Sequence, residues 1–174
     1  EGTEIDVTGG SVTLTASDDG INAAGDSGAV LVSVSGGILQ INASGDGLDS
    51  NSADSYGGIK FTGGKSVIIS YGSADSAIDT ERGYSYSGGY VVAIGLSGGM
   101  SSESYNCSNF ANHGKTGRLS LNKGEIVTVS GIANVKMPVS MNALVVVLGS
   151  TDAAISSATS SSVTLDANGV GWIA

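Results

Sequence analysis

The sequence predicts an all-β protein folded as a parallel β-helix, and a repeat and the composition both point to it. A stretch of alternating apolar and polar residues followed by Gly-Gly occurs three times, ending at Gly10, Gly37 and Gly64. Each copy lies 27 residues after the previous one. A period of this length is typical of a solenoid, in which each repeat forms one coil. The 174 residues include 28 Gly and 1 Pro, and the apolar residues are mostly Val, Ile, Leu and Ala. Such a composition favours short strands joined by tight turns.

Each repeat is expected to contain three strands and three corners. In the first repeat, apolar residues such as Val7 and Leu14 alternate with polar ones, so one face of each strand points inward. Gly9 and Gly10 separate the first two strands, because glycine readily adopts the positive φ that a sharp corner needs. A second corner at 17–20 precedes a short third strand. Three strands and three corners describe one coil of a parallel β-helix.

Stacking of the coils should place equivalent residues about 4.8 Å apart, the usual spacing of neighbouring strands. The expected inward columns are Val7, Val34 and Phe61, and Leu14, Ile41 and Ile69. The third coil is less regular, since Asp75 lies 29 residues after Asp46 instead of 27. Two one-residue insertions are therefore predicted near 65–71.

The repeat fails after a fourth coil opens at 88–95, and the chain is expected to divide into three parts. Residues 1–95 form the β-helix coils, residues 96–117 a loop or crossover, and residues 118–174 a C-terminal β cap packed on the helix. The expected cap strands are 117–121, 125–130, 135–138, 144–148 and 162–165. Solenoids need such caps over their open ends to stay soluble.

The charge balance bears on possible partners. With 7 basic and 16 acidic residues, the net charge is -9, which argues against binding to nucleic acid or anionic lipid. No run of about 18 apolar residues exists, so insertion into a membrane is not expected. The chain opens directly into the first repeat, and no signal peptide is expected. The lone Cys107 cannot form an internal disulfide and is expected to be a buried free thiol.

Acidic residues recur at one corner of the predicted coils. The candidates for metal binding are Asp18, Asp19, Asn22, Asp46, Asp49, Asn51, Asp75 and Asp79. Stacked carboxylates repel one another unless a cation lies between them. Calcium suits such a site because it accepts several carboxylate, amide and carbonyl oxygens in flexible geometry. The alternative is a ladder in which Asp and Asn side chains hydrogen-bond the backbone of each turn. Both interpretations are open at this point.

Aromatic residues gather in one part of the chain, and sugar rings stack on aromatic faces. The candidates for carbohydrate binding are Tyr71, Tyr84, Tyr86 and Tyr90, together with the nearby cation Arg82. In a continuous strand, Tyr84, Tyr86 and Tyr90 would share one face. Alternatively, these tyrosines only cover apolar surface. His113 has no Ser or Cys partner at a recognisable spacing, so no nucleophilic triad is expected.

Five segments of the predicted coils carry recognisable motifs. They are Ser-Val-Thr-Leu-Thr-Ala-Ser-Asp-Asp-Gly-Ile-Asn-Ala-Ala-Gly at 11–25, Gly-Asp-Gly-Leu-Asp-Ser-Asn at 45–51, Ala-Ile-Asp at 77–79, Gly-Gly-Tyr-Val-Val-Ala-Ile-Gly at 88–95 and Gly-Gly-Met at 98–100. Together with a looser match at 135–138 and 143–147, they resemble a family of carbohydrate-binding β-helix proteins of bacterial cell surfaces. The family is similar in shape to pectate lyases. The resemblance covers about residues 4–150.

This resemblance implies a right-handed, three-sided parallel β-helix that binds calcium, with affinity for cellulose or acidic polysaccharides but without lyase chemistry. Two departures are noted. The family usually has further coils before the first one seen here, and this chain continues through 153–174. An uncovered first coil would expose strand edges, which proteins normally protect.

The sequence therefore favours a noncatalytic polysaccharide-binding protein, extracellular or at the cell surface, with calcium held at the acidic corners. Its expected partner is cellulose or a polyuronate. The alternative is a structural subunit that stacks end to end into a fibre or layer, forming a homo-oligomer. Weak lyase activity is a further alternative.

Overall fold

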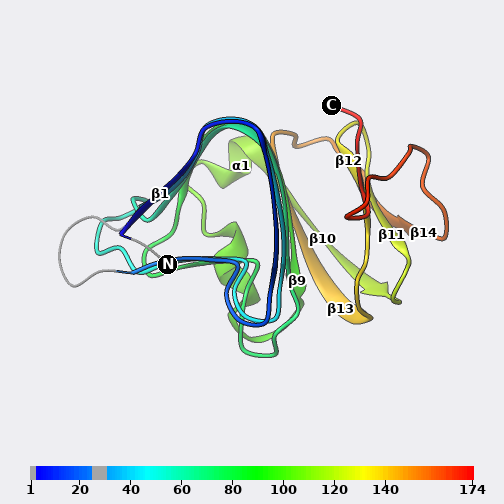
Figure 1. Ribbon diagram of the computed structural model, residues 1–174, viewed down its shortest axis with the longest axis horizontal. Helices are drawn as coiled ribbons and strands as arrows, with labels where there is room; N and C mark the ends of the chain where they lie inside the picture. Colours follow the sequence, from blue (N-terminus) through cyan, green and yellow to red (C-terminus); the bar gives the residue numbers. More distant parts are fainter. Residues whose placement is uncertain (1–2, 25–30) are drawn as a thin grey trace.

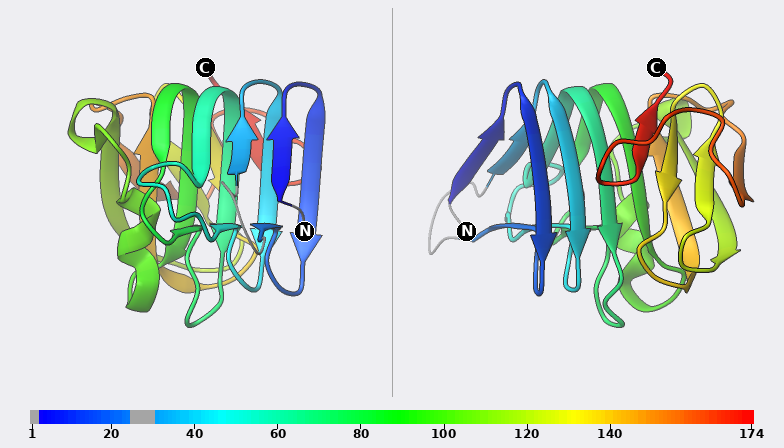
Figure 2. Two further views of the ribbon diagram at one scale, coloured as in Figure 1. Left: turned by 90° about the vertical axis from the view of Figure 1, so that its left-hand side faces the viewer. Right: turned by 45° about the vertical axis from the view of Figure 1, so that its right-hand side comes forward.

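The computed structural model describes residues 3–24 and 31–174. It is nearly all-β and forms a β-solenoid of about three turns with about 27 residues per turn, as predicted. Seen nearly end-on, the coils superimpose around a common interior, and a second, smaller sheet lies to one side (Figure 1). The left view of Figure 2 shows the coils side by side in a row, with the C-terminal strands behind them. None of the described helices is long and apolar enough to cross a membrane.

Parallel strands form the three walls of the solenoid. The first wall consists of β1 (Glu4–Val7), β4 (Leu31–Val34) and the first parts of β7 (Ile59–Ser70) and β9 (Ser85–Leu96). The second wall consists of β2 (Ser11–Ala16), β5 (Ile38–Ala43) and the second parts of β7 and β9. The third wall consists of β3 (Ile21–Ala23), β6 (Leu48–Ser50) and β8 (Ile78–Thr80). The first three coils thus contribute to all three walls, whereas β9 of the fourth coil contributes to the first two.

Gly-Gly pairs form the corner between the first two walls. Their second members, such as Gly37 and Gly64, have φ values of 75° and 76°, the left-handed region that favours glycine. Their first members are packed closely against the preceding coil. A Cβ atom on Gly36 would lie 2.5 Å from the carbonyl oxygen of Thr8. Glycine is therefore required at the second position by the backbone conformation, and at a first position such as Gly36 by the close approach of the neighbouring coil.

The pairing of the strands confirms one predicted column and corrects the other. Val34 pairs with Val7 and with Phe61, as predicted. Ile41, however, pairs with Ile68, so the prediction of Ile69 in this column is wrong.

The predicted insertions near 65–71 are also wrong. The 27-residue offset holds as far as Ser70, which pairs with Ala43, whereas Ile78 pairs with Leu48 at an offset of 30. The turn between β7 and β8 therefore contains the three extra residues, because a turn can lengthen without breaking the ladder of either strand.

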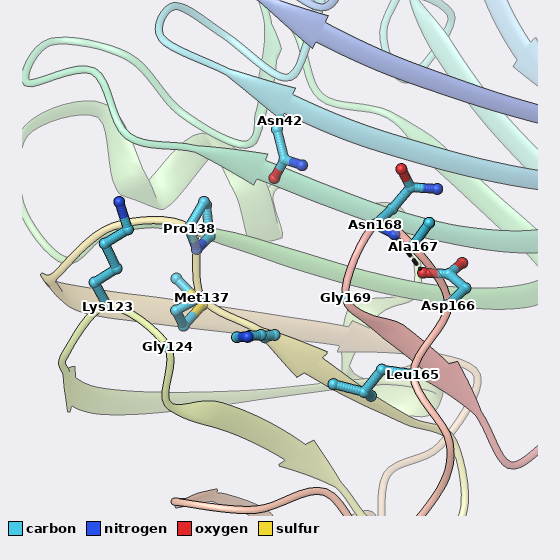
Figure 3. Close-up of a pocket in the computed structure, with 11 residues that line it drawn as sticks. Asn42, Lys123, Gly124, Met137, Pro138, Leu165, Asp166, Ala167, Asn168 and Gly169 are labelled. Atoms are coloured by element: carbon cyan, nitrogen blue, oxygen red, sulfur yellow. Dashed lines mark hydrogen bonds between the residues drawn. The ribbon is translucent and has the colours of Figure 1, made fainter.

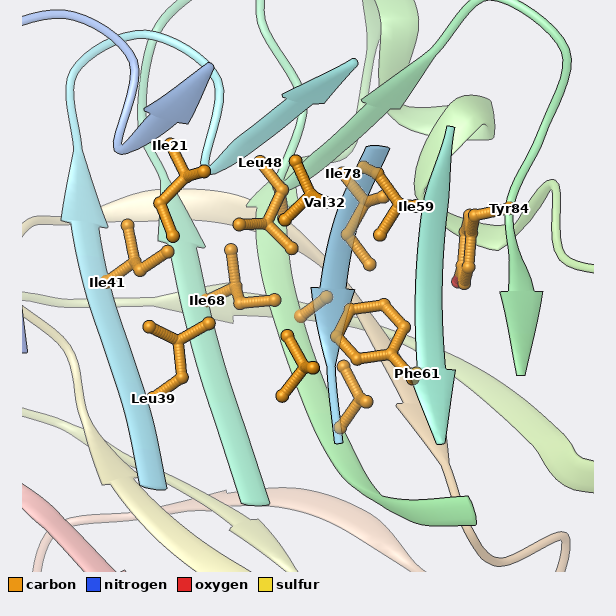
Figure 4. Close-up of a cluster of buried hydrophobic side chains, with 14 of the residues drawn as sticks. Ile21, Val32, Leu39, Ile41, Leu48, Ile59, Phe61, Ile68, Ile78 and Tyr84 are labelled. Carbon is orange, nitrogen blue, oxygen red and sulfur yellow. The ribbon is translucent and has the colours of Figure 1, made fainter. Parts of the chain in front are cut away.

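The interior of the solenoid is a continuous apolar core (Figure 4). Ile21, Leu48 and Ile78 stack along the third wall, and all three side chains are buried. Phe61 contacts Tyr84 edge to face, with ring centroids 5.8 Å apart. Cys107 is a free, buried thiol, as predicted. Burial of these columns is the main stabilising contribution to the stack.

The segment after β9 leads out of the solenoid through two short helices, η1 (Gly99–Tyr105) and α1 (Phe110–His113). Strand β10 (Gly114–Leu121) follows, so the expected loop at 96–117 contains both helices and the start of a strand. Strand β13 (Met141–Leu148) pairs antiparallel with β9, and β10 pairs with β13. These two strands cap the last coil by covering its open edge.

The remaining strands form a four-stranded antiparallel sheet in the order β14-β11-β12-β15. They are β11 (Ile126–Val129), β12 (Ala133–Lys136), β14 (Ile155–Ala158) and β15 (Val170–Trp172). The prediction of a strand at 162–165 is wrong, because these residues belong to the loop between β14 and β15. Figure 1 shows this sheet beside the outer face of the solenoid wall that contains β9.

The contact between this sheet and the second wall forms a second apolar core. It includes Val67 and Ile69 of β7 and Val92 and Ile94 of β9. Two of the outward columns of the second wall are Thr13, Gln40, Val67 and Val92, and Thr15, Asn42, Ile69 and Ile94. The outer face therefore changes from polar in the first two coils to apolar in the next two. The apolar runs in β7 and β9 arise because both faces of these strands are covered.

Candidate functional site

Acidic side chains gather where the chain enters the third wall. We call Asp19, Asn22, Asp46, Asp49, Asp75, Asp79 and Glu103 the acidic corner. The middle residues of β3, β6 and β8 are Asn22, Asp49 and Asp79, and parallel pairing places them in register, as predicted. Each coil thus adds one oxygen-bearing side chain to the same column.

A second column lies in the turn before these strands. The Asp19 carboxylate accepts a hydrogen bond from the backbone N–H of Asp46 at 2.8 Å. The Asp46 carboxylate accepts one from the backbone N–H of Ser76 at 2.6 Å. Ser76, and not Asp75, is therefore the third-coil equivalent of Asp46, because three residues are inserted in the turn before β8. Asp side chains thus do hydrogen-bond the backbone of the next turn, which was one of the two interpretations of the sequence.

Asn22 links the two columns. Its Nδ2 group donates to Asp19 at 2.9 Å and to Asp49 at 2.7 Å. An amide between two carboxylates reduces their repulsion without adding positive charge. The Oδ1 atom of Asn22 is buried and accepts no hydrogen bond from the described residues.

Several carboxyl groups of this corner have raised pKa values. Burial is the main reason that the pKa of Asp46 is raised to about 7. The negative charges of Asp79, Asp75 and Asp19 raise it further, whereas the hydrogen bond from Ser76 lowers it. Burial and the charge of Asp79 likewise raise the pKa of Asp49 to about 6. The pKa of Asp75 is raised for the same reasons. Near neutral pH, the corner is therefore only partly ionised.

Glu103 of η1 also belongs to the acidic corner, although no sequence pattern indicated it. Burial, followed by a hydrogen bond shared with Asp79, raises the pKa of Glu103 to about 8. Both residues line a hollow of about 220 Å³ together with Asn51, Thr80 and Glu81. Glu103 lies outside the repeat, so only the path of the crossover brings it to Asp79.

The remaining metal candidates lie at the edge of this corner. Asp18 is exposed, and its charge contributes to the raised pKa of Asp75. Asn51 is exposed and lines the hollow beside Asp79. The structure therefore brings all eight predicted residues into one region of the solenoid.

The oxygen-bearing side chains of this region are of the types that a hard cation accepts. Within 3–24 and 31–174, no three Asp, Glu, His or Cys side chains are already spaced to hold a metal ion. Three buried oxygen atoms nevertheless lack a hydrogen-bond partner, namely Asn22 Oδ1, Thr80 Oγ1 and Glu103 Oε2. Carboxylate, amide and hydroxyl oxygens are ligands that calcium accepts. The residues fit calcium in type, and binding would require the hydrogen-bonded carboxylates to reorient.

The predicted aromatic face does not exist as a single surface. Tyr84 is 0% exposed, and its hydroxyl donates to the carbonyl of Ser104 at 2.7 Å. Tyr86 is 9% exposed and belongs to the same interior core, whereas Tyr90 packs against the second core outside the wall. The prediction of one shared face is wrong because the Gly-Gly corner at 88–89 interrupts the alternation between Tyr86 and Tyr90.

Two of the carbohydrate candidates are therefore interior residues, and the others are accessible. Tyr71 and Tyr90 are half-buried beside the second core, and Arg82 is exposed. Their contact with sugar stays a prediction.

Replacing Tyr84 with phenylalanine is expected to lower stability slightly and to leave glycan binding unchanged. The substitution removes the hydrogen bond to Ser104 but keeps the ring against Phe61. The expected loss in the free energy of unfolding is about 1 kcal/mol. Thermal unfolding and retention on a polysaccharide matrix would measure the two effects. Loss of retention by a normally folded variant would instead place Tyr84 in the binding site.

Comparison with known families relates this architecture to a function. A family model described as "Carbohydrate-binding domain-containing protein" matches residues 2–169, nearly the whole chain. The chain belongs to this family. A search of curated proteins found no match, and neither did a search of solved structures. Membership indicates a carbohydrate-binding domain with a polysaccharide as its partner.

Proposed function

We propose that this domain binds cellulose or an acidic polysaccharide outside the cell and holds calcium at the acidic corner. The family match over residues 2–169 is the observation that carries the polysaccharide partner. The acidic sugar is favoured because calcium can join a protein carboxylate to a uronate carboxylate. An extracellular location fits a polysaccharide partner.

The calcium proposal follows from the electrostatics of the corner. The raised pKa values of Asp46 and Asp49 mean that ionising these carboxyls is unfavourable without a cation. A bound dication would supply the missing positive charge. Asp19, Asp46, Asp49 and Asp79 would hold the ion, with Asn22 turning its unpaired oxygen toward it.

Retention on polysaccharide matrices would test this function. The protein is expected to be retained on cellulose or polygalacturonate in the presence of calcium, and less strongly after treatment with a chelator. The Asp49→Asn/Asp79→Asn variant should lose the response to calcium, because it removes two of the proposed ligands. A variant at the exposed Asp152 in the cap is the matched control. If neither matrix retains the unaltered protein, the proposed function is wrong.

A structural role is the second candidate, and the strand order supports it. Among the described strands, β1, β2 and β3 each pair on one side only. A head-to-tail contact at such an edge would produce open filaments. Light scattering at increasing protein concentration, with and without calcium, would test this role. A particle size of one chain under all conditions would exclude it.

A further inference from the structure

A groove lies between the outer face of the second wall and the loops of the small sheet (Figure 3). We call it the cap groove. Its volume is about 480 Å³, within the range of roughly 300–1,000 Å³ typical of small-molecule sites. Asn42 of β5 forms one side of the groove, and Asp166 and Asn168 of the loop before β15 form another. The groove lies on the outer face of the solenoid, whereas the hollow beside the acidic corner is lined by β8 and η1.

Hydrogen bonds hold the wall of the cap groove in place. Gln40 donates from Nε2 to Asp166 Oδ2 at 2.7 Å, and Asn168 donates from Nδ2 to Thr13 Oγ1 at 3.2 Å. The other oxygen of Asp166 accepts the backbone N–H groups of Asn168 and Val170, both at 2.9 Å. The loop is therefore attached to the first two coils of the solenoid. A site formed in advance in this way needs little ordering when a ligand binds.

The ionisation of Asp166 agrees with this role in the wall. Burial alone would raise its pKa, but hydrogen bonds from Gln40 and from the backbone N–H groups of the loop outweigh burial and lower the pKa. The Asp166 carboxylate therefore stays charged and is occupied by hydrogen bonds within the protein.

The groove concentrates positive charge on an acidic protein. Lys123 and Lys136 both line it and are exposed, and they are two of only 7 basic residues in a chain of net charge -9. No ion pair joins either ammonium group to a carboxylate in the described part of the chain. Asn42 adds an Oδ1 atom without a hydrogen-bond partner among the described residues. Ammonium groups bind carboxylates through charge-assisted hydrogen bonds, and amide groups can hydrogen-bond hydroxyl groups.

The floor of the groove is less polar. Pro138 of the loop after β12 and Leu165 of the loop before β15 line it, and both are partly exposed. Apolar side chains can cover the C–H face of a sugar ring and remove it from water. Sugar sites commonly combine such a floor with hydrogen-bonding groups at the sides.

We propose that the cap groove binds a uronic acid residue of an acidic polysaccharide, with Lys123 and Lys136 contacting its carboxylate. Asn42 and Asn168 then contact the ring hydroxyls, and Pro138 and Leu165 lie against the ring. This assignment rests on the proposed polysaccharide-binding function and narrows its ligand to a polyuronate. A neutral sugar of the same shape would leave both ammonium groups without an anion, so the groove discriminates by charge.

Calorimetry with oligogalacturonates and neutral cello-oligosaccharides would test the assignment. The Lys123→Ala/Lys136→Ala variant is expected to bind oligogalacturonate about tenfold or more weakly, because each charge-assisted hydrogen bond contributes measurably. Lys123→Arg/Lys136→Arg keeps the charge and should retain most of the affinity. Lys60→Ala, at an exposed position on β7 outside the groove, is the matched control and should bind normally. Thermal unfolding checks that every variant is folded.

The possible outcomes separate this assignment from the proposed function. Uronate binding that is equal in the unaltered protein and the double alanine variant would overturn the cap groove as its site while leaving polysaccharide binding intact. Binding to neutral cello-oligosaccharides alone would overturn the choice of a uronate. An unaltered protein that binds neither sugar would overturn both the groove and the proposed function.

Discussion

Alanine in place of Gly63 should lower the free energy of unfolding by about 2–3 kcal/mol, whereas alanine in place of Gly9 should leave it nearly unchanged. The two glycines occupy the same position of the repeat, at the corner between the first two walls. A Cβ atom at Gly63 would lie 2.3 Å from the carbonyl oxygen of Ser35, but one at Gly9 would have nothing within 4 Å. The obstructing atom is backbone, so the coils themselves would have to separate.

Thermal unfolding would measure this difference directly. For a domain of this size, the expected fall in Tm is about 4–12 °C for Gly63→Ala. Gly36→Ala should behave similarly, because its Cβ atom would lie 2.5 Å from the carbonyl oxygen of Thr8. Equal effects at Gly9 and Gly63 would show that the coils do not stack as described.

Stability is expected to fall as the pH rises from about 4 to about 7, and Asp46→Asn should reduce this fall. The pKa of Asp46 is raised from 3.8 to about 7 on folding, so the folded protein holds the proton more tightly than the unfolded chain. Asp46 therefore makes its full contribution to stability below the unfolded pKa of 3.8, and this contribution is lost as the pH rises through the folded pKa of about 7. Asparagine carries no charge, yet it keeps an oxygen that can accept the N–H of Ser76.

The difference in Tm between Asp46→Asn and the unaltered protein, measured from pH 4 to pH 8 in a chelator, would test this effect. We expect the variant to be more stable at pH 8 by about 1–2 kcal/mol, allowing for solvent screening at a half-exposed site, and nearly equal at pH 4. Asp152→Asn, at an exposed position in the cap, should show no such dependence. A variant less stable than the unaltered protein at pH 8 would contradict this electrostatic account.

Calcium should change the same pH profile, because it would bind the ionised form of the corner. At pH 8, calcium is expected to raise the Tm of the unaltered protein and to have a smaller effect on Asp46→Asn. At pH 4, where Asp46 and Asp49 are protonated, it should have little effect on either protein. Equal effects of calcium at both pH values would argue against binding at the acidic corner.

Much of the solenoid could be predicted from the sequence because its evidence is local and repeated. The copies of Gly-Gly at 9–10, 36–37 and 63–64 mark the corner, and the residues between them alternate with the period of a strand. Stacking identical coils then fixes the column of Asn22 and Asp49, since equivalent positions lie on adjacent strands. The prediction failed for Ile69 and Asp75 because it placed the extra residues before Ser70, whereas they lie in the turn after it.

The binding surfaces depend on contacts that no local pattern records. Asp79 meets Glu103 because the crossover returns to the third wall, and Asn42 faces Asp166 because a loop distant in the sequence folds over the second wall. Tyr84 and Tyr90 separate because a corner interrupts the strand between them.

The sequence by itself determined the β-solenoid, its coil length and the alignment of most acidic side chains, because a repeated pattern imposes the same backbone pairing in every coil. Only the tertiary structure decided how the nonrepeating segments cover the last coil, which acidic side chains lie close together and where a groove remains. Those features arise from packing between distant segments, and such packing is set by the shape and burial of whole surfaces.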